Sequence, residues 1–355
     1  MSSTNQNISI RDVWKAFRQR KTAVIACGIL GFWIFAAVFA DFIANESPLY
    51  CVYQGESYFP AFTPNRLDTL HNEVTGKNQV LVFHKVNWKE RPVDFVIWPL
   101  VPYGPDPYRS RNRLSPFGDQ TLPNSDEVLH GKFRHHLGTT SKGVDLLAGL
   151  IHGARISLKV GFIAIFIAFL IGVLLGSLAG YFGDKVDILI SRLIEVFNSL
   201  PRLLLIISIA AVFERSLELI MIIIGFTSWP GIARITRAEV LKVRALEHIE
   251  SVRALGLSHT HILLRHILPN SLAPVIVVLT IGIGQAIIAE SSLSFLNLVD
   301  NSQSWGGILS SARSYFSDWW LAVFPGISIF LTVLSINLIG ERLRDVTDPR
   351  THSDL

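Results

Sequence analysis

The stretch VGFIAIFIAFLIGVLLGSLAGYFG, residues 160–183, contains no charged side chain and is long enough to cross the hydrocarbon core of a bilayer as one helix. Three further uncharged segments of similar length lie at 22–40, 271–289 and 319–340. Hydrophobic residues make up 50% of the chain, charged residues make up 17%, and the mean hydropathy is +0.40. This is the composition of a membrane protein rather than of two or three soluble domains.

Two weaker apolar segments complete the pattern. Segment 203–213 reaches the length of a span only with the amphipathic lead-in from about Asp187, and segment 219–233 does so only if its helix starts near Ser216. With both included, the sequence predicts an all-α polytopic membrane protein with six transmembrane helices.

Basic residues predict the orientation. They are concentrated before the first span, in the loop 234–270 and after the last span, whereas the loops between spans three and four and between spans five and six hold only Arg215 and Arg313. Because cytoplasmic loops carry the excess of Lys and Arg, both termini and the loop 234–270 are expected in the cytoplasm. The start of the chain is expected to be a basic amphipathic segment and not a cleaved signal peptide.

The region between the first two spans is expected to be a small β-rich insertion on the extracytoplasmic side. Short apolar runs at 80–83 and 95–98, separated by prolines, predict strands. Cys51 in this region and Cys27 in the first span are not expected to form a disulfide, which leaves one free thiol outside. The predicted regions are a cytoplasmic segment 1–21, a transmembrane helix 22–43, the insertion 44–154, a transmembrane core 155–341 that includes the loop 234–270, and a cytoplasmic tail 342–355.

The loop 234–270 has the pattern of a charged helix between apolar segments. Ile249, Val252 and Leu255 recur at helical spacing and predict a buried face. The other sides of this helix carry charged side chains suited to a water-exposed partner, namely Glu247, Glu250 and Arg253.

A corner and a second helix are expected to follow. Gly256 accepts the left-handed backbone that ends a helix, and Ser258 can cap the next one. Pro269 is expected to break that second helix, with Asn270 capping the apolar segment beyond it.

Several strings carry a family resemblance. LGTTSKGVDLLAGLIHGARISL (137–158), GYFGDKVD (180–187), RLIEVFNSLP (192–201) and TSWPGIARITRAEVL (227–241) resemble segments of binding-protein-dependent ABC importer permeases. ESVRALGLSHTHILLRHILPN (250–270), AESSLSFLNL (289–298) and NLIGERLRDVTDPR (337–350) resemble the second permease of oligopeptide, dipeptide and nickel importers. The segment 43–62 resembles the longer-looped branch typified by the microcin C and oligopeptide importer permease.

The resemblance implies the six-helix fold of type I ABC importers and half of a translocation path for peptides or peptide-like solutes, with nickel chelates as the alternative cargo. It implies a second homologous permease, two ATPase subunits and an extracytoplasmic solute-binding protein as partners in the bacterial cytoplasmic (inner) membrane. A membrane-embedded enzyme or sensor with an external domain is the alternative from a different class.

In that family the cytoplasmic loop carries a coupling helix that sits in a groove of the ATPase, and its motif is Glu-Ala-Ala followed by a glycine. Here Glu250 and Gly256 match, whereas Ser251 and Val252 replace the alanines. The alternative is a solvated loop between helices. The coupling residues that the resemblance implies are Glu250, Ser251, Arg253, Ala254, Leu255 and Gly256.

The first external motif departs from the family pattern. It keeps Gly138, Gly143 and Asp145, but Thr140 and Val144 stand where the family usually has an acidic residue and an arginine. The polar contacts of those two positions are therefore not implied for this chain.

Polar residues inside spans are either structural or line a path, because charge is costly there. Arg202 after Pro201 is one such position. For Arg192 and Glu195, the simpler interpretation is that they pair with each other. For the amides of Gln285 and Asn337, the simpler interpretation is hydrogen bonding between helices. The candidates for the path or for helix packing are Arg192, Glu195, Gln285, Glu290 and Asn337.

Several other functions are not expected. No GxxxxGK[ST] string occurs, so ATP and Mg are expected on a partner ATPase, and this chain is expected to be neither an enzyme nor a cofactor carrier. His259 and His261 would point apart on a helix, which argues against a zinc site, as does the isolated pair of His135 and His136. The pI near 9.1 reflects cytoplasmic flanks rather than nucleic-acid binding. A group of aromatic residues is interpreted as a membrane-interface belt, namely Trp305, Phe316, Trp319 and Trp320.

Overall fold

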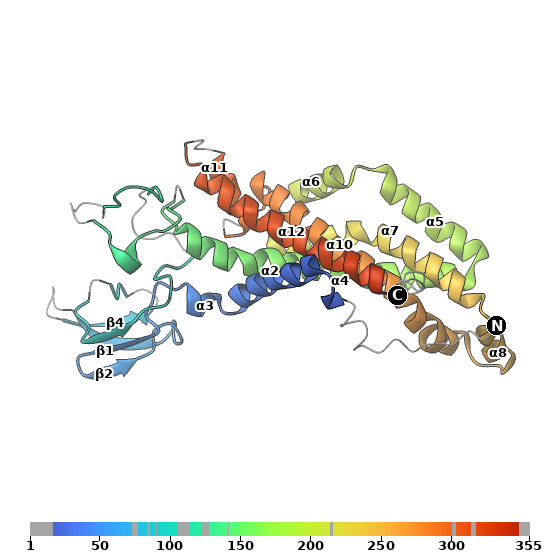
Figure 1. The fold of residues 1–355 in the computed structure, drawn as a ribbon, viewed down its shortest axis with the longest axis horizontal. Coiled ribbons are helices and arrows are strands. Elements are labelled where there is room, and N and C mark those ends of the chain that lie inside the picture. The colour runs from blue at the N-terminus through green and yellow to red at the C-terminus, as the bar shows by residue number, and fades with distance from the viewer. Residues whose placement is uncertain are drawn as a thin grey trace. The chain divides into compact units, whose positions relative to one another are not determined.

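The computed structural model describes residues 17–72, 77–83, 86–89, 91–105, 114–121, 128–140, 142–213, 216–299, 303–313 and 317–347 (Figure 1). In this part of the chain, five helices are long and apolar enough to cross a membrane, and a bent helix pair raises the number to six if it counts as one span. The prediction of a polytopic helical protein is confirmed. The five are α2 (Lys21–Val38), α4 (Leu146–Phe182), α7 (Leu217–Arg244), the stretch His259–Phe295 and α12 (Trp320–Thr347).

The third expected span is broken. Helices α5 (Asp184–Ser199) and α6 (Arg202–Val212) meet at an angle of 81°. Leu200 precedes Pro201 and has the extended dihedrals φ −95° and ψ 135°, because the proline ring excludes the helical conformation from the residue before it. The amphipathic lead-in is therefore a separate helix rather than the first half of a straight one.

The fourth span starts where the longer alternative placed it. The Ser216 side chain accepts a hydrogen bond from the backbone N–H of Leu219 at 3.1 Å and caps α7. The helix then runs to Arg244, well beyond the apolar segment that predicted it.

The loop 234–270 contains the end of α7, then α8 (Glu247–Ala254), α9 (His259–His261), the π-helix η3 (Ile262–Ile267) and the start of α10 (Leu268–Phe295). Contrary to the prediction, Pro269 does not break the second helix. The N–H of Leu268 bonds to the carbonyl of Leu263, one residue further back than in an α-helix, and Pro269 then falls in the first turn of α10. A proline is tolerated there because its missing N–H is not needed. Asn270 donates from Nδ2 to the carbonyl of His266 at 2.7 Å instead of capping a new helix.

The chain divides into two compact units. The first comprises Met1–Phe32, Ser157–Asn301 and Ile329–Leu355, and the second comprises Trp33–Ile156 and Ser302–Ser328. In the first unit, α4 and α7 (green and yellow in Figure 1) pack closely through glycines. A Cβ on Gly176 would lie 2.5 Å from the carbonyl oxygen of Ala233, and one on Gly180 would lie 2.7 Å from that of Arg237. Small residues at every fourth position allow helix backbones to approach in this way.

The second unit contains the β-rich insertion. Strand β1 (Tyr50–Tyr53) lies between β2 (Glu56–Tyr58) and β5 (Phe95–Ile97) in an antiparallel sheet, with Cys51 opposite Tyr58 and Val96. Strands β3 (Leu67–Asn72) and β4 (Lys77–Val82) form a separate hairpin. The strands predicted around 80–83 and 95–98 are confirmed. Both cysteines are free, and Cys51 is buried.

The end of the insertion is tied to the first span. α4 already begins at Leu146, inside the region expected to be insertion, and Asp145 accepts a capping hydrogen bond from the N–H of Ala148 at 2.8 Å. Beyond α2, the short helix α3 (Ala40–Ile43) carries Asp41, which receives Nη2 of Arg155 at 2.9 Å. A 3₁₀ turn, η2 (Gly131–Phe133), lies in the segment before α4.

The prediction that the aromatic residues near the last span form a membrane-interface belt is wrong for two of them. Trp305, the first residue of α11 (Trp305–Ala312), is fully buried and donates from Nε1 to the carbonyl of Leu150 at 2.9 Å. Trp320 is also buried and donates to the carbonyl of Thr139 at 3.3 Å. Of the described members of this group, Trp319 alone is exposed, and Phe316 lies outside the described residues. The indole N–H groups find partners inside the protein, which favours burial of the ring.

Candidate functional site

The helix α8 packs on the protein through two apolar side chains and exposes the others. Ile249 is fully buried, and Val252 packs against the same cluster, which includes Tyr181 and Val243. Leu255, predicted to share this face, is instead 79% exposed. The helix ends at Ala254, so Leu255 has left the helical periodicity on which that prediction relied.

The corner after α8 has the predicted geometry. Gly256 has φ +75°, and a Cβ there would meet nothing within 4 Å, so the glycine is required by its backbone and not by crowding. Ser258 accepts from the N–H of His261 at 3.4 Å and caps α9, as predicted. The residues that the resemblance assigns to coupling all have exposed side chains or backbone, namely Glu250, Ser251, Arg253, Ala254, Leu255 and Gly256.

One polar contact joins this corner to α4, and a second joins α4 to the end of α7 beside it. The hydroxyl of Tyr181, near the end of α4, lies 2.8 Å from Nδ1 of His259. Arg244, at the end of α7, donates from Nη1 to the carbonyl of Tyr181 at 2.8 Å. The exposed face of α8 therefore lies above a cluster formed by α4, α7 and the π-helix.

Among the path candidates, the α5 pair lies at the surface. Arg192 donates to Glu195 at 2.6 Å, and the two side chains are 74% and 61% exposed. An exposed pair of this kind contributes about 0–1 kcal/mol to stability. A second ion pair on the same helix escaped the sequence reasoning: Asp187 receives Nη2 of Arg237 on α7 at 2.6 Å.

Glu290 is enclosed. Its side chain is fully buried in α10 and accepts from the hydroxyl of Ser294 at 2.7 Å and from that of Ser157 on α4 at 3.5 Å. Gln285 and Asn337 instead have exposed side chains, and neither makes a hydrogen bond within the described ranges. Their amides are available to whatever covers α10 and α12 in an assembly. Arg202 donates to Ser228 on α7, which in turn donates to the carbonyl of Ile224.

The second unit contains a buried polar network that the sequence reasoning also missed. Asp145 accepts from Nδ1 of His135 at 2.8 Å, and the His135 ring stacks on Tyr103 with centroids 4.1 Å apart. The ammonium of Lys89 lies 3.7 Å from the centroid of the same Tyr103 ring. Burial lowers the pKa of Lys89 to about 8. Thr140 accepts at Oγ1 from the N–H of Val144 at 3.1 Å, so the two residues that depart from the family motif contact each other.

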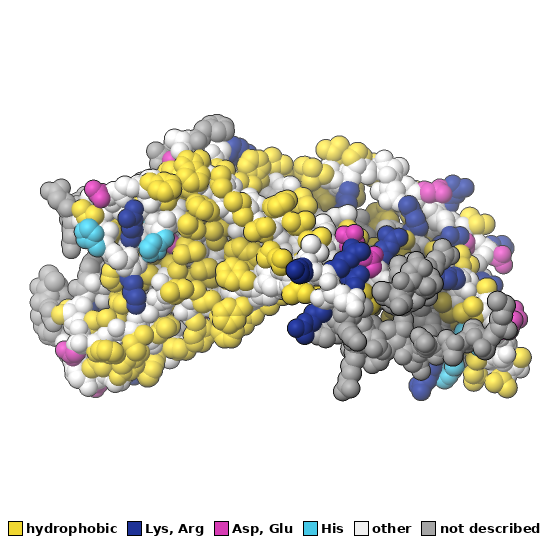
Figure 2. Space-filling model, in the orientation of Figure 1, with side chains coloured by type: hydrophobic (Ala, Val, Ile, Leu, Met, Phe, Trp, Pro, Cys, Tyr) yellow, Lys and Arg dark blue, Asp and Glu magenta, His cyan; other side chains and the backbone are white. Residues whose placement is uncertain are grey.

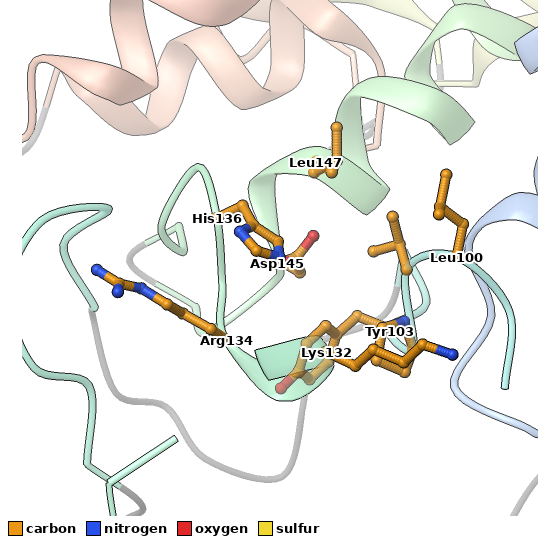
Figure 3. A pocket seen from close by; sticks show the side chains of 9 residues that line it. Leu100, Tyr103, Lys132, Arg134, His136, Asp145 and Leu147 are labelled. Carbon is orange, nitrogen blue, oxygen red and sulfur yellow. The ribbon is translucent and has the colours of Figure 1, made fainter. Parts of the chain in front are cut away.

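A cavity of about 130 Å³ borders this network (Figure 3). His136 and Asp145 lie side by side at its wall, whereas the guanidinium of Arg134 points away and donates to the carbonyl of Gly118 at 3.1 Å. Because both oxygens of Asp145 are already bonded, to His135 and Ala148, we interpret the cavity as part of the structure that starts α4. Among the described residues, no group of three His, Cys, Asp or Glu side chains is arranged to hold a metal ion.

Sequence comparisons with known proteins agree on one family. Residues 172–353 match the model of the binding-protein-dependent transport system inner membrane component, and residues 10–61 match the N-terminal TM domain of oligopeptide transport permease C. The dipeptide transport system permease protein of Alkalihalophilus pseudofirmus is 41% identical over 65% of this chain and 77% of its own length. The glutathione transport system permease protein of Pectobacterium atrosepticum is 36% identical over 68% of this chain and 81% of its own length. An inward-facing structure of the MetNI methionine ABC transporter covers 57% of this chain and 98% of its own chain, with 21% identity and a TM-score of 0.48.

Proposed function

This chain belongs to the family of binding-protein-dependent transport system inner membrane components, and from that premise we propose that it forms half of an import path for peptides or peptide-like solutes. The two relatives named above are permeases of dipeptide and glutathione transport systems, which supports a peptide cargo over a nickel chelate. Membership of the family leaves no support for a membrane-embedded enzyme or sensor. Assignment to the microcin C branch stays a prediction from segment 43–62.

The observation that carries the coupling role is the contrast between the two sides of α8. One side is fixed by the buried Ile249 and the partly buried Val252, and the other presents Glu250, Ser251 and residues 253–256 to solvent. Two ATPase subunits that bind ATP and Mg would close on this surface. Because Tyr181 shares the cluster of Ile249, a displacement of α8 is transmitted to the end of α4.

The proposed arrangement places both termini and α8 in the cytoplasm and the β-rich insertion outside. A second homologous permease completes the path, and a solute-binding protein delivers cargo on the outer side. The exposed amides of Gln285 and Asn337 are suited to face that second permease or the path, where polar side chains are hydrated or paired.

Reconstitution of the complete complex tests the cargo. The permease pair, the ATPases and the binding protein are placed in proteoliposomes, and ATP turnover is measured with dipeptides, tripeptides, glutathione and a nickel chelate added singly. We expect a peptide to stimulate turnover. Stimulation by the nickel chelate alone would overturn the cargo assignment while leaving the transport role intact.

The orientation has its own test. A cysteine introduced at Arg253, in a chain with Cys27→Ala, is labelled by a membrane-impermeant maleimide in intact and in permeabilised cells. We expect labelling after permeabilisation only. Labelling in intact cells would contradict the cytoplasmic position of α8.

A further inference from the structure

The sheet of the insertion is apolar on both faces. On one face, Cys51 and Tyr53 of β1 are buried against Phe83 and Trp88. On the other face, Phe95 of β5 is 53% exposed. A sheet with one face on a core and one face in water normally alternates apolar with polar residues, so a large exposed aromatic face indicates a neighbour other than water.

This exposed face is connected to the first span by a continuous series of ring contacts, which we call the aromatic ladder. Centroids of successive rings are 4.8 to 6.3 Å apart. All of its phenylalanines are between 42% and 56% exposed. The members, in order of contact, are Phe35, Phe39, Phe42, Phe62, Phe59, Tyr50 and Phe95.

The ladder begins on the first helix that is long and apolar enough to span the membrane. Phe35 lies in α2, a helix that is apolar enough to span the membrane and is mostly not buried inside the protein. Its exposed apolar side chains are suited to face lipid. Phe39 and Phe42 extend this exposed surface beyond the end of α2. Phe62 of the insertion continues it, with its ring centroid 5.0 Å from that of Phe42. Figure 2 shows hydrophobic side chains gathered over α2 and α3 and over the sheet.

We propose that the insertion rests on the bilayer surface, with the aromatic ladder in the interfacial region of the leaflet where α2 ends. Phenylalanine rings bury their apolar surface at the boundary between headgroups and acyl chains, and a tyrosine can sit there with its hydroxyl near water. The hydroxyl of Tyr50 has a polar partner in Ser57 at 3.0 Å, which satisfies the one polar atom of the ladder. The insertion is then held at membrane level instead of extending freely into water.

Spin labelling of the assembled transporter in lipid nanodiscs tests the proposal. Single cysteines are introduced by Phe95→Cys and Phe62→Cys in a Cys27→Ala chain, and collisions with oxygen and with a water-soluble nickel chelate are measured. Glu56→Cys is the matched control, since Glu56 is exposed on β2 and lies opposite Tyr53 rather than on the aromatic face. Background labelling stays low because Cys51 is fully buried and burial raises its pKa to about 11.

We expect the ratio of oxygen collisions to nickel collisions to exceed one at positions 62 and 95 and to fall below one at position 56. Equal, water-like ratios at all three positions would overturn the proposal. Low collision rates with both reagents and an immobilised spectrum at positions 62 and 95 would also overturn it, since they would indicate that a protein partner covers the ladder. Two ladder positions are used so that failure of one variant to fold leaves the other to decide.

Discussion

The hydroxyl of Tyr181 lies 2.8 Å from Nδ1 of His259, so the last turn of α4 is hydrogen-bonded to the helix that follows the Gly256 corner. The Tyr181 ring also packs in the cluster that contains Ile249, the buried anchor of α8. Both helices of the corner therefore reach α4 through one side chain. This makes Tyr181 the residue at which coupling and span packing can be separated by mutation.

Tyr181→Phe removes the hydrogen bond and keeps the ring. The bond contributes about 1 kcal/mol, so the complex is expected to assemble and hydrolyse ATP, with less solute imported per ATP. Uptake and ATP turnover are measured together in proteoliposomes. Tyr50→Phe, which removes the hydroxyl bonded to Ser57 in the insertion, is the matched control and should leave the ratio unchanged. If Tyr181→Phe imports as much solute per ATP as the natural chain, the hydrogen bond between Tyr181 and His259 does not contribute to coupling.

Gly256→Val is expected to uncouple ATP turnover from uptake. At φ +75° a β-branched residue is strained by about 1–2 kcal/mol, although open space surrounds the position. Gly256→Asn adds a side chain that tolerates the left-handed region and should be much milder. If Val and Asn impair uptake equally, the side chain and not the backbone is responsible, and the corner geometry is irrelevant.

Local chemistry made much of this site predictable. Short-range backbone rules are enough to predict that a glycine after an apolar-periodic run ends the helix and that a serine two residues later caps the next one. Gly256 and Ser258 both confirm these predictions. Leu255 was misjudged because a periodicity argument assumes that the helix continues. The prediction that Pro269 breaks the helix is wrong because a π turn precedes it and places the proline in the first turn of α10. No pattern in the sequence predicts a π turn.

Longer-range contacts were less predictable for a different reason. The spacing of Gly172, Gly176 and Gly180 is typical of a helix face that packs closely against another helix. A prediction based on hydropathy alone does not detect this spacing. The pairs Asp187 with Arg237 and His135 with Asp145 join residues far apart or in irregular segments, and no helical or strand period relates them.

Gly176→Ala is expected to weaken the packing of α4 on α7. The new Cβ would lie 2.5 Å from the carbonyl oxygen of Ala233, so the helices must separate, at a cost of about 1–3 kcal/mol. The thermal unfolding midpoint of the purified protein should fall. Gly28→Ala in α2 is the control, since nothing lies within 4 Å of its Cβ. Equal midpoints for the two variants would contradict the close approach.

Glu290→Gln is expected to preserve both stability and uptake, because the amide oxygen can accept from Ser294 while the amide nitrogen donates to the hydroxyl of Ser157, which can also act as an acceptor. Glu290→Leu removes the acceptor and leaves buried hydroxyls to find other partners, at about 1–3 kcal/mol. Thermal unfolding and uptake are measured for both. A Gln variant with wild-type stability and no uptake would assign Glu290 to the path instead of to helix packing.

Lys89 should make stability depend on pH. Burial lowers its pKa from the ordinary 10.5 to about 8, so between these values the unfolded chain binds a proton that the folded chain does not. The penalty is absent above pH 10.5, grows as the pH falls and is complete below about pH 8. A shift of this size corresponds to roughly 3 kcal/mol of stability.

Lys89→Met keeps the length of the side chain and has no charge to bury, so it should unfold at a higher temperature than the natural chain at pH 7.5. The difference should shrink as the pH is raised toward 10.5, because the natural chain then buries a neutral amine. Lys132→Met, at an exposed position of the same unit, is the control and should show no such convergence. A difference between the Lys89 variant and the natural chain that stays constant across this range would mean that the Lys89 amine keeps its ordinary pKa.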